Sequence, residues 1–450
     1  MRFHILTLGC PKNQVDSEGM TQLLTMAGHV EAESPEDADY IIVNTCGFIG
    51  TAREESFAAL REMARHKQSG QMLIAAGCMA ERYGTALRRQ VPELDGLVGT
   101  RRWAQIESLL DILGRRRQGG ELVNLIREGN YSLVSSFPRS ARLGVYAYLK
   151  IADGCSAPCA FCAIPMIKGP QRSKPQAEII AEARQLAGLG VKEIILIAQD
   201  TTSYGRDQGE LDALPTLIKE ITMVASDLQW LRIMYAYPQH ITPRLIEIMA
   251  RHLQVCHYLD MPLQHGHPDV LRRMGRPADT QRALAIIEDL RTAMPDIALR
   301  TAFIVGYPGE TEEEFTALLG FMERIAFDKV GIFAYSLEEG TRAATLPDQI
   351  ADEVKNERYE RAMELQQRIS LKVNKAQVGR QMDVLVGGFG EGISVGRTYR
   401  DAPEIDGLVL VEGECPVGDI VAVRITGAME YDLIGVVEDE EEREGSRRSC

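Results

Sequence analysis

Short runs of β-branched and other apolar residues recur along the first hundred residues, separated by amphipathic segments of helical length. The runs lie at residues 3–8, 40–43 and 72–76, with a weaker one at 97–98. Strands that alternate with helices in this way predict a parallel sheet. Since a helix-like stretch ends near Leu113, we predict an open parallel α/β domain over residues 1–113.

The same alternation returns after a segment that lacks it. Residues 114–142 contain Gly, Arg, Ser and Pro138 without periodicity, which predicts a linker. Six apolar runs follow, at residues 146–151, 193–198, 231–235, 258–262, 299–305 and 329–335. Six βα repeats predict a partial (β/α)₆ barrel over residues 143–375, with an open side, because eight repeats close the complete form. An open doubly wound sheet is the alternative.

The last part of the chain has a different pattern. One long amphipathic helix is predicted over residues 352–378. The segments then shorten and glycine-rich turns appear, as at Gly387-Gly388 and Asp406-Gly407. This pattern predicts a small antiparallel β-barrel over residues 376–437. Residues 438–450 are charged and are predicted to be a disordered tail.

The composition is that of a folded protein with several domains. The chain has 450 residues, of which 45% are hydrophobic and 25% charged. No apolar stretch approaches the roughly 20 residues that span a bilayer, and the first residues lack a signal-peptide pattern. We therefore expect a cytoplasmic protein that does not bind membranes, and we expect a monomer. The chain has no phosphate-loop, zinc-protease or dinucleotide-binding motif, which argues against nucleotide hydrolysis and nicotinamide chemistry.

Three closely spaced cysteines carry the strongest chemical signal. The nine cysteines are an odd number, and in a reducing compartment metal binding is favoured over disulfides. Cys155, Cys159 and Cys162 directly follow a predicted barrel strand. Three thiolates can hold three irons of a [4Fe–4S] cluster and leave the fourth iron open for a ligand. Structural zinc prefers four ligands, and a simple electron carrier would have four cysteines.

The residues between these cysteines indicate a family. The run from Cys155 to Cys162, with the aromatic Phe161 before the last cysteine, resembles the signature of radical S-adenosylmethionine enzymes. The resemblance implies the partial barrel. It also implies that the amino and carboxylate groups of S-adenosylmethionine bind the open iron, and that one electron from the cluster cleaves this cofactor to a 5′-deoxyadenosyl radical.

A second set of cysteines occupies equivalent places in the first domain. Cys10, Cys46 and Cys78 each follow the end of a predicted parallel strand. Because ligands gather at the carboxyl ends of such strands, the three should converge and hold a second cluster. Three buried, inert cysteines are the alternative. The other cysteines fit neither set, and we assign them as a core thiol, a barrel thiol and a tail thiol: Cys256, Cys415 and Cys450.

The segments around these cysteines resemble three motifs of the methylthiotransferases, and the resemblance covers nearly the whole chain. The segments are residues 8–13, 43–48 and 76–78. The resemblance implies two [4Fe–4S] clusters with S-adenosylmethionine as co-substrate. It further implies that the N-terminal cluster supplies or binds the sulfur and that a C-terminal TRAM barrel engages the substrate. An electron donor such as a flavodoxin or ferredoxin is expected, together with a possible sulfur donor.

Several residues at strand ends are candidates for contact with S-adenosylmethionine. They are Phe161, Gln199, Gln264, Ile304 and Gly306. Ordinary strand-end turns are the alternative, and Ala302 stands where this family usually has glycine.

Other polar residues nearby are given structural roles. His265 and His267 are assigned to a polar loop without a metal. Three acidic residues after Thr311, at positions 312–314, are explained by capping of a helix.

The substrate is predicted from charge and motif detail together. Methylthiotransferases modify either adenosine in transfer RNA or an aspartate of small-subunit ribosomal protein twelve. Residues 376–435 contain four basic and ten acidic residues, a net charge of −6. An RNA-binding barrel should be basic, whereas an acidic one suits a basic ribosomal protein. Residues 9–13, 199–201, 262–265 and 401–407 also resemble the ribosomal-protein branch. We expect modification of the aspartate β-carbon, with transfer RNA as the alternative substrate.

Overall fold

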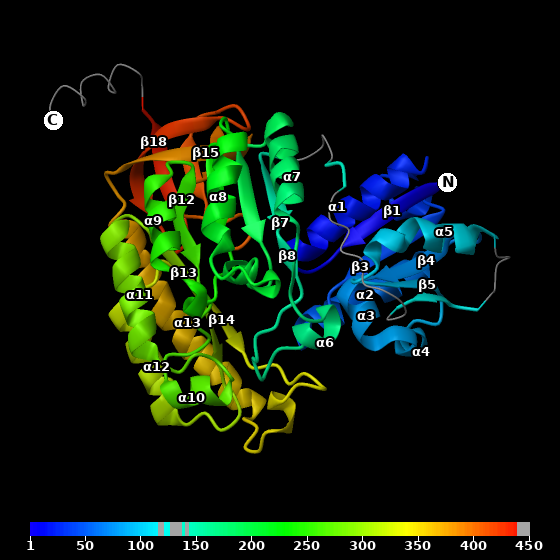
Figure 1. Cartoon of the computed structure of the whole chain (residues 1–450), viewed down its shortest axis with the longest axis horizontal. Helices are drawn as coiled ribbons and strands as arrows, with labels where there is room; N and C mark the ends of the chain where they lie inside the picture. Colours follow the sequence, from blue (N-terminus) through cyan, green and yellow to red (C-terminus); the bar gives the residue numbers. More distant parts are fainter. Residues whose placement is uncertain (116–120, 127–136, 140–143, 439–450) are drawn as a thin grey trace.

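The computed structural model describes residues 1–115, 121–126, 137–139 and 144–438. Three parts follow one another along the chain: a parallel α/β domain, a second parallel sheet flanked by helices, and a small β-barrel (Figure 1). Cys450, the predicted tail beyond Glu438 and much of the predicted linker lie outside the described residues. Within the described ranges, no helix has both the length and the apolar character needed to cross a membrane.

The N-terminal sheet has six parallel strands in the order β2-β1-β3-β4-β5-β6. The strands are β1 (Arg2–Thr7), β2 (Val30–Glu31), β3 (Tyr40–Thr45), β4 (Met72–Ala76), β5 (Leu94–Gly99) and β6 (Val123–Leu125). The helices are α1 (Pro11–Met26), α2 (Gly50–His66), α3 (Gly77–Tyr83), α4 (Leu87–Gln90) and α5 (Ile106–Arg115). The strand order reverses between β1 and β3, where ligands of such sheets bind.

Two strands of this sheet were not predicted. β2 is only two residues long, and β6 lies in the segment that the sequence pattern assigned to the linker. Gly96, Leu97 and Val98 of β5 pair in parallel with β6. Residues 123–125 therefore belong to the sheet rather than to an irregular connection. The domain boundaries themselves stay a prediction.

The central sheet also has six parallel strands, in the order β14-β13-β12-β11-β10-β7. These are β7 (Tyr146–Lys150), β10 (Glu193–Ile197), β11 (Trp230–Ile233), β12 (Val255–Asp260), β13 (Ala298–Val305) and β14 (Lys329–Ala334). Spatial order follows chain order without a reversal, so right-handed crossovers place the connecting helices on one face. In a doubly wound sheet, the spatial order of the strands would reverse at one point. The predicted partial (β/α)₆ barrel is thus confirmed, and β7 and β14 are its two edge strands.

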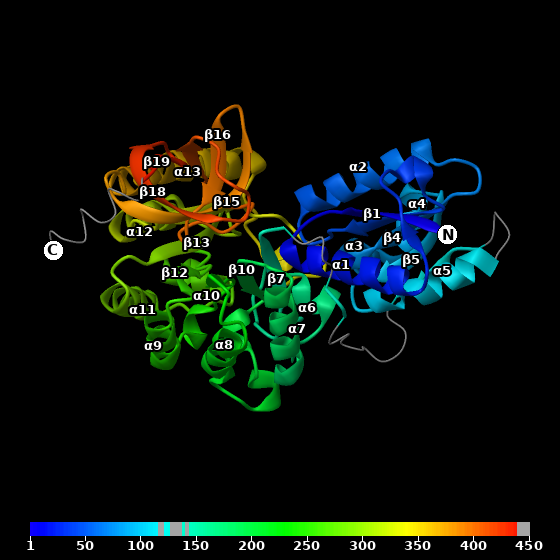
Figure 2. The ribbon, with the colours of Figure 1, turned by 90° about the horizontal axis from the view of Figure 1, so that it is seen from above.

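The helices of the central part cover the outer face of this sheet (Figures 1 and 2). They are α7 (Gln176–Gly188), α8 (Ala213–Val224), α9 (Pro243–Arg251), α11 (Thr280–Ala293), α12 (Glu312–Ile325) and α13 (Asp352–Lys375). Two short helices, α6 (Ile164–Lys168) and α10 (Pro268–Arg273), and the hairpin of β8 (Ala152–Asp153) with β9 (Arg172–Ser173) lie in the loops.

Alternate residues of the strands face two different cores. Leu149, Ile194 and Leu196 pack against the outer helices. Tyr148, Ile195 and Ile197 belong to a second core, which also includes residues of α1 and of the C-terminal barrel. Because a strand alternates its side chains between faces, this periodicity positions both neighbouring domains on the concave side of the partial barrel. α1 accordingly lies beside β7 (Figure 2).

The C-terminal part is a closed barrel, as predicted, and it has five strands. The strands are β15 (Gln381–Gly390), β16 (Ile393–Arg397), β17 (Val409–Glu412), β18 (Ile420–Ala428) and β19 (Leu433–Val437). All described pairs are antiparallel except β17 with β19, which pair in parallel. A buried ion pair anchors the barrel to the central sheet: Arg397 lies 2.7 Å from Glu193 of β10.

Candidate functional site

The three cysteines of the N-terminal domain lie at the ends of neighbouring strands. Cys10 follows β1 and forms the N-cap of α1, Cys46 follows β3, and Cys78 lies in the first turn of α3 after β4. Since β1 adjoins β3 and β3 adjoins β4, the cysteines share one rim of the sheet. Cys46 and Cys78 are buried, and Cys10 is partly exposed. The predicted convergence at the strand ends is therefore present.

Asn13 connects the loops that carry these cysteines. Its side-chain amide donates hydrogen bonds to the carbonyl oxygens of Leu8, at 3.0 Å, and Thr45, at 3.1 Å. The Asn13 Oδ1 atom accepts a contact from the Cys78 Sγ atom at 3.6 Å. One buried side chain thus fixes the geometry of the loops around all three sulfur atoms.

Gly9 is required where two of these loops meet. Its φ is +91°, which favours glycine, and a Cβ atom at this position would lie 2.8 Å from the Cβ atom of Cys46. The absence of a side chain lets the loop before Cys10 approach Cys46 closely.

The central cysteines lie on a loop that follows the first barrel strand. Backbone hydrogen bonds hold this loop at both ends: Cys155 N donates to Gly169 O at 3.0 Å, and Ala160 N donates to Met274 O at 2.8 Å. Ala343 N in turn donates to Ala160 O at 2.8 Å. All three sulfur-bearing residues are partly exposed. Backbone hydrogen bonds therefore fix the loop at the mouth of the barrel, and each of its cysteines is only partly exposed.

The two cysteine sets adjoin each other across the domain boundary. The Cys78 side chain packs in one buried cluster with Ala163, which directly follows Cys162, and with Ile167 of α6. α3 and α6 are in contact at this point (Figure 1). Arg101 reinforces the boundary, because its guanidinium donates to the Ile167 carbonyl oxygen at 2.8 Å.

Buried charges of both signs lie beside this boundary. Asp16 of α1 pairs with Lys150 and lies 3.6 Å from Lys168, which lies 3.1 Å from Asp153. Burial alone would raise the pKa of Asp153, but Lys150 and Lys168 outweigh it and hold the pKa well below its usual value. The four charges therefore form a balanced network that joins α1 to the central sheet.

The predicted S-adenosylmethionine contacts fall into two groups. Phe161 and Ile304 pack against the same small core, which includes Ala160 and Tyr307. Gln264 is joined to this group through its backbone, since Ile304 N donates to Gln264 O at 2.8 Å. Gln264 also has a φ of 75°, an unusual value for a residue other than glycine, in the segment after β12.

Gln199 and Gly306 lie farther along the rim. Gln199 follows β10 and is half-buried. Gly306 has a φ of +68°, and a Cβ atom there would lie 2.4 Å from the Lys355 Cγ atom of α13. Close packing against α13 thus explains this glycine. Contact of any of the five residues with the cofactor stays a prediction.

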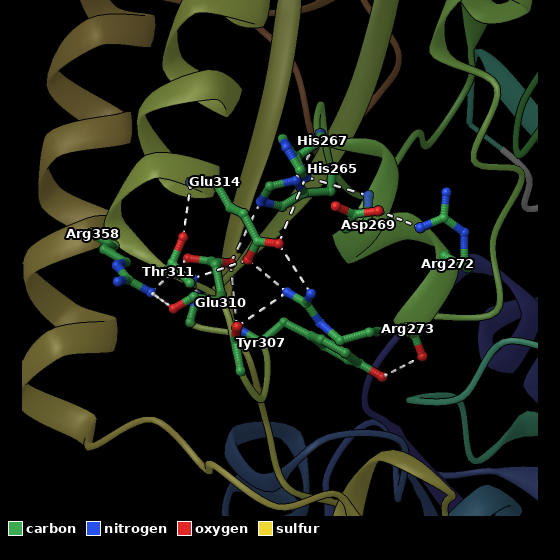
Figure 3. A network of polar contacts seen from close by, with 12 residues as sticks. His265, His267, Asp269, Arg272, Arg273, Tyr307, Glu310, Thr311, Glu314 and Arg358 are labelled. Carbon is green, nitrogen blue, oxygen red and sulfur yellow. Dashed lines mark hydrogen bonds and ion pairs between the residues drawn. The ribbon is translucent and has the colours of Figure 1, made fainter.

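Glu310 organises the turn that carries Gly306 (Figure 3). Its carboxylate accepts hydrogen bonds from the backbone N–H groups of Gly306, at 3.1 Å, and Tyr307, at 3.4 Å. Arg358 of α13 donates to the same carboxylate at 2.8 Å. The turn after β13 is therefore held by an ion pair rather than by apolar packing alone.

A group of potential metal ligands lies beside this turn. Atoms of His267, Asp269 and Glu314 lie within 4.8 Å of one another (Figure 3). Arg273 already binds both carboxylate oxygens of Glu314, at 3.0 and 2.6 Å, and Arg272 pairs with Asp269. Because two guanidinium groups neutralise these carboxylates, we assign no metal here. Glu314 and Thr311 also form the capping box of α12, as the acidic run after Thr311 predicted.

Family models match three consecutive parts of the chain. They are described as uncharacterized protein family UPF0004 over residues 2–99, the radical SAM superfamily over residues 149–322 and the TRAM domain over residues 378–437. A relative from Roseiflexus sp. (strain RS-1), named ribosomal protein uS12 methylthiotransferase RimO, is 50% identical, and the alignment covers 97% of each chain. The chain belongs to the RimO family. The predicted methylthiotransferase resemblance is thereby confirmed.

Further members of the family and a solved structure agree with this assignment. RimO proteins of Herpetosiphon aurantiacus and Desulforamulus reducens are 50% and 44% identical over 97% and 96% of this chain, and over 100% and 98% of their own. The radical S-adenosylmethionine methyltransferase TsrM from Kitasatospora setae is 13% identical, with a TM-score of 0.56 over 88% of this chain and 80% of that one. This likeness shows the fold.

The two cysteine sets of this RimO family member do not have the spacing of a single zinc site. A single zinc ion holds thiolates at about 2.3 Å, so its sulfur ligands lie only about 4 Å apart. Among the described residues, neither cysteine set brings its three sulfur atoms within 4.8 Å of one another. Among the described residues, neither set is therefore as tightly grouped as the ligands of one zinc ion.

Burial raises the pKa values of several of these thiols, so that their ionisation to thiolates needs a nearby cation. It raises the pKa of Cys46 to about 11 and that of Cys162 to about 12, and neighbouring cysteines raise both pKa values further. The pKa of Cys78 is also well above its usual value because of burial. Without a metal the thiols are protonated, whereas iron stabilises their thiolates.

Two residues near the site have contacts that sequence patterns did not reveal. Lys12 Nζ lies 3.0 Å from the centroid of the Tyr235 ring, across the domain boundary. Arg276 stacks on the Tyr237 ring at 4.1 Å and reaches the Cys159 Sγ atom at 3.8 Å. Lys12 lies inside a family motif, which marked its position but not its contact. No local signal indicated Arg276.

Proposed function

We propose that this chain transfers a methylthio group to the β-carbon of an aspartate of ribosomal protein uS12. The observation that carries the proposal is the packing of Cys78 against Ala163 and Ile167, which makes two cysteine sets neighbours. A radical-generating site and a sulfur site must both reach one carbon atom for such a reaction, so adjacency is a requirement of the chemistry. Membership of the RimO family supports the same conclusion.

Two [4Fe–4S] clusters are part of the proposal. Cys155, Cys159 and Cys162 would hold the cluster that binds S-adenosylmethionine, and the three N-terminal cysteines would hold the second. When bound, the first cluster and its cofactor supply a 5′-deoxyadenosyl radical that removes hydrogen from an unactivated carbon. Arg276, at 3.8 Å from Cys159 Sγ, would stabilise the thiolate by its positive charge.

The charge of the TRAM barrel supports a protein substrate over transfer RNA. Of its four arginines, Arg397 and Arg400 are buried in ion pairs with Glu193 and Asp328 of the central domain. The other two, Arg380 and Arg424, are exposed, and so are six acidic residues: Asp383, Glu391, Glu404, Glu412, Glu414 and Asp419. Asp401 and Asp406 instead pair with Lys329 and Arg300 of the central domain. An exposed surface of this kind repels phosphates and attracts a basic ribosomal protein.

The test is an anaerobic assay with the reconstituted protein, S-adenosylmethionine and a strong reductant. Purified uS12 and bulk transfer RNA are supplied separately, and mass spectrometry searches each for the added methylthio group. We expect the modification on uS12, and modification of transfer RNA alone would overturn the proposal. Replacing the chemical reductant by a flavodoxin or ferredoxin, and adding sulfide, tests the proposed electron donor and an external sulfur source.

A further inference from the structure

Lys12 differs from the other buried lysines of this chain. Lys12 is only 5% exposed. Lys150 and Lys174 also have largely buried side chains, and each pairs with a carboxylate. Lys168 lies 3.1 Å from Asp153, and Lys329 lies 2.7 Å from Asp401. In the described part of the chain, no carboxylate forms an ion pair with Lys12, and its ammonium has only the Tyr235 ring as a close partner.

Cys10 contributes most to the electrostatic field at Lys12, and the nearest carboxylates, Asp260 and Asp153, are already bound to other cations. Asp260 contributes to the electrostatic field at Lys12, but its Oδ1 atom lies 2.8 Å from Arg300 and its Oδ2 atom accepts a hydrogen bond from Tyr235 N at 3.2 Å. Asp153 belongs to the ion-pair network of Lys168. The positive charge of Lys12 is therefore the one left unmatched by this group of carboxylates.

A buried ammonium without a paired carboxylate is costly, because burial removes its hydration and no ion pair replaces it. The Tyr235 ring stabilises one side of the ammonium through its π-electrons, but an ammonium has three N–H donors. The remaining donors are suited to an oxyanion ligand. A carboxylate would give a charge-assisted hydrogen bond and match the charge at the same time.

The position of Lys12 places such an anion at the reaction site. The residue lies in the first turn of α1, two positions after Cys10. Tyr235 lies two positions after the carboxyl end of β11. Its carbonyl oxygen accepts a hydrogen bond at 3.0 Å from Thr201 N, in the loop after β10. Lys12 thus bridges the second cysteine set and the barrel rim where the radical would form.

We propose that Lys12 binds the side-chain carboxylate of the substrate aspartate and so determines which side chain is modified. The inference rests on the proposed function and extends it to a substrate contact. In aspartate the carboxylate carbon is bonded directly to the β-carbon, so fixing the carboxylate positions the carbon that receives the methylthio group. An asparagine side chain has nearly the same shape but no charge, and it would lose this contact.

The test is a double-mutant cycle between the enzyme and a peptide. The reconstituted enzyme is titrated anaerobically with a fluorescent peptide that spans the target aspartate of uS12, and with the same peptide carrying asparagine. Lys12→Met should weaken binding of the aspartate peptide about ten-fold, the scale of one charge-assisted hydrogen bond, and leave binding of the asparagine peptide nearly unchanged. Lys219→Met, on the exposed face of α8, is the matched control and should change neither value.

Iron content separates the substrate role from a role in cluster binding, because Lys12 is close to Cys10. The Lys12→Met enzyme should retain the iron of the wild type. Loss of iron, or equal weakening of both peptides, would overturn the inference. Lys12→Gln keeps polarity without charge, and it should show the same loss of preference if the Met variant fails to fold. A wild-type enzyme that neither binds nor modifies the aspartate peptide would overturn the proposed function as well.

Discussion

Glu338 accepts a hydrogen bond from Arg82 at 2.6 Å and another from Arg53 at 3.2 Å. Arg82 lies on α3 with Cys78, and Arg53 lies on α2, which follows Cys46. Glu338 comes from the loop after β14, at the far end of the central sheet, and its side chain is only 2% exposed. One buried carboxylate therefore connects the segments that follow two N-terminal cysteines to the barrel.

Glu338→Ala should loosen this connection. Removing one partner of a buried pair leaves two uncompensated guanidinium groups, so we expect the free energy of unfolding to fall by about 3 kcal/mol. The cysteine sets should also lose their fixed distance, so that more 5′-deoxyadenosine forms per methylthio product. Anaerobic urea unfolding and chromatography of both products measure the two effects.

An exposed ion pair provides the control for that experiment. Glu247 and Arg251 pair at 2.7 Å on the surface of α9, with side chains 50% and 74% exposed. Glu247→Ala should cost less than about 0.5 kcal/mol and leave the product ratio unchanged. The prediction is wrong if Glu338→Ala matches the control in its free energy of unfolding and in its ratio of 5′-deoxyadenosine to methylthio product. This connection would then be unimportant.

Substitutions in the two cysteine sets should have different effects on the reaction. Replacing Cys155, Cys159 or Cys162 by alanine should abolish cleavage of S-adenosylmethionine while about four of about eight irons persist, because one cluster loses a ligand. Replacing Cys10, Cys46 or Cys78 should remove a similar amount of iron but leave some cofactor cleavage without sulfur transfer. Iron analysis and anaerobic assays of 5′-deoxyadenosine and of modified uS12 distinguish these outcomes.

Cys415→Ala is the matched control, since this buried cysteine belongs to the core of the TRAM barrel. It should retain all iron and both reaction products. Sulfur transfer by any of the N-terminal cysteine variants would contradict the proposal that one cluster cleaves the cofactor and the N-terminal cluster is needed for sulfur transfer.

The sequence located the strands and the cysteines because both obey local rules. Strand β4 has the predicted bounds of residues 72–76, since apolar runs of this length mark buried parallel strands. The convergence of Cys10, Cys46 and Cys78 followed from their common place after parallel strands. Strand β6 was missed because it has three residues in a segment without periodicity.

Contacts across domains had no local signal. Glu338 and Arg82 are 256 positions apart in the chain, and neither lies in a pattern that predicts a partner. The contact between Lys12 and Tyr235 likewise depends on how two domains pack together. Such pairs arise from tertiary structure, which periodicity along one chain does not encode.

His265 should make the stability of the protein depend on pH. Burial lowers its pKa below the ordinary value of 6.5, although Glu310 opposes this shift, so the folded protein favours the neutral ring. The unfolded chain binds a proton at a higher pH, and stability is therefore lost as the pH falls below 6.5 toward the folded pKa. We expect His265→Gln to lose less stability than the wild type between about pH 7.5 and 5.5, by at most ~1.4 kcal/mol per pH unit.

Parallel urea unfolding of both proteins across this range measures the difference. All other titratable groups are common to the two proteins, so the difference between their curves isolates His265. Curves of equal slope would contradict the prediction.

Gly77→Ala tests how closely the N-terminal loops must pack. Gly77 has a φ of +90°, and a Cβ atom would lie 2.2 Å from Asn44 Oδ1 and 2.7 Å from the Thr45 carbonyl oxygen. Gly190 has a similar φ of +86° but no atom within 4 Å of such a Cβ. Both substitutions impose backbone strain of about 1 kcal/mol, whereas only the first must displace the start of α3, which carries Cys78. We therefore expect Gly190→Ala to keep about eight irons per chain and Gly77→Ala to keep about four. Full iron content in Gly77→Ala would show that the cysteines tolerate a displaced loop, and that their close packing is not what holds the second cluster.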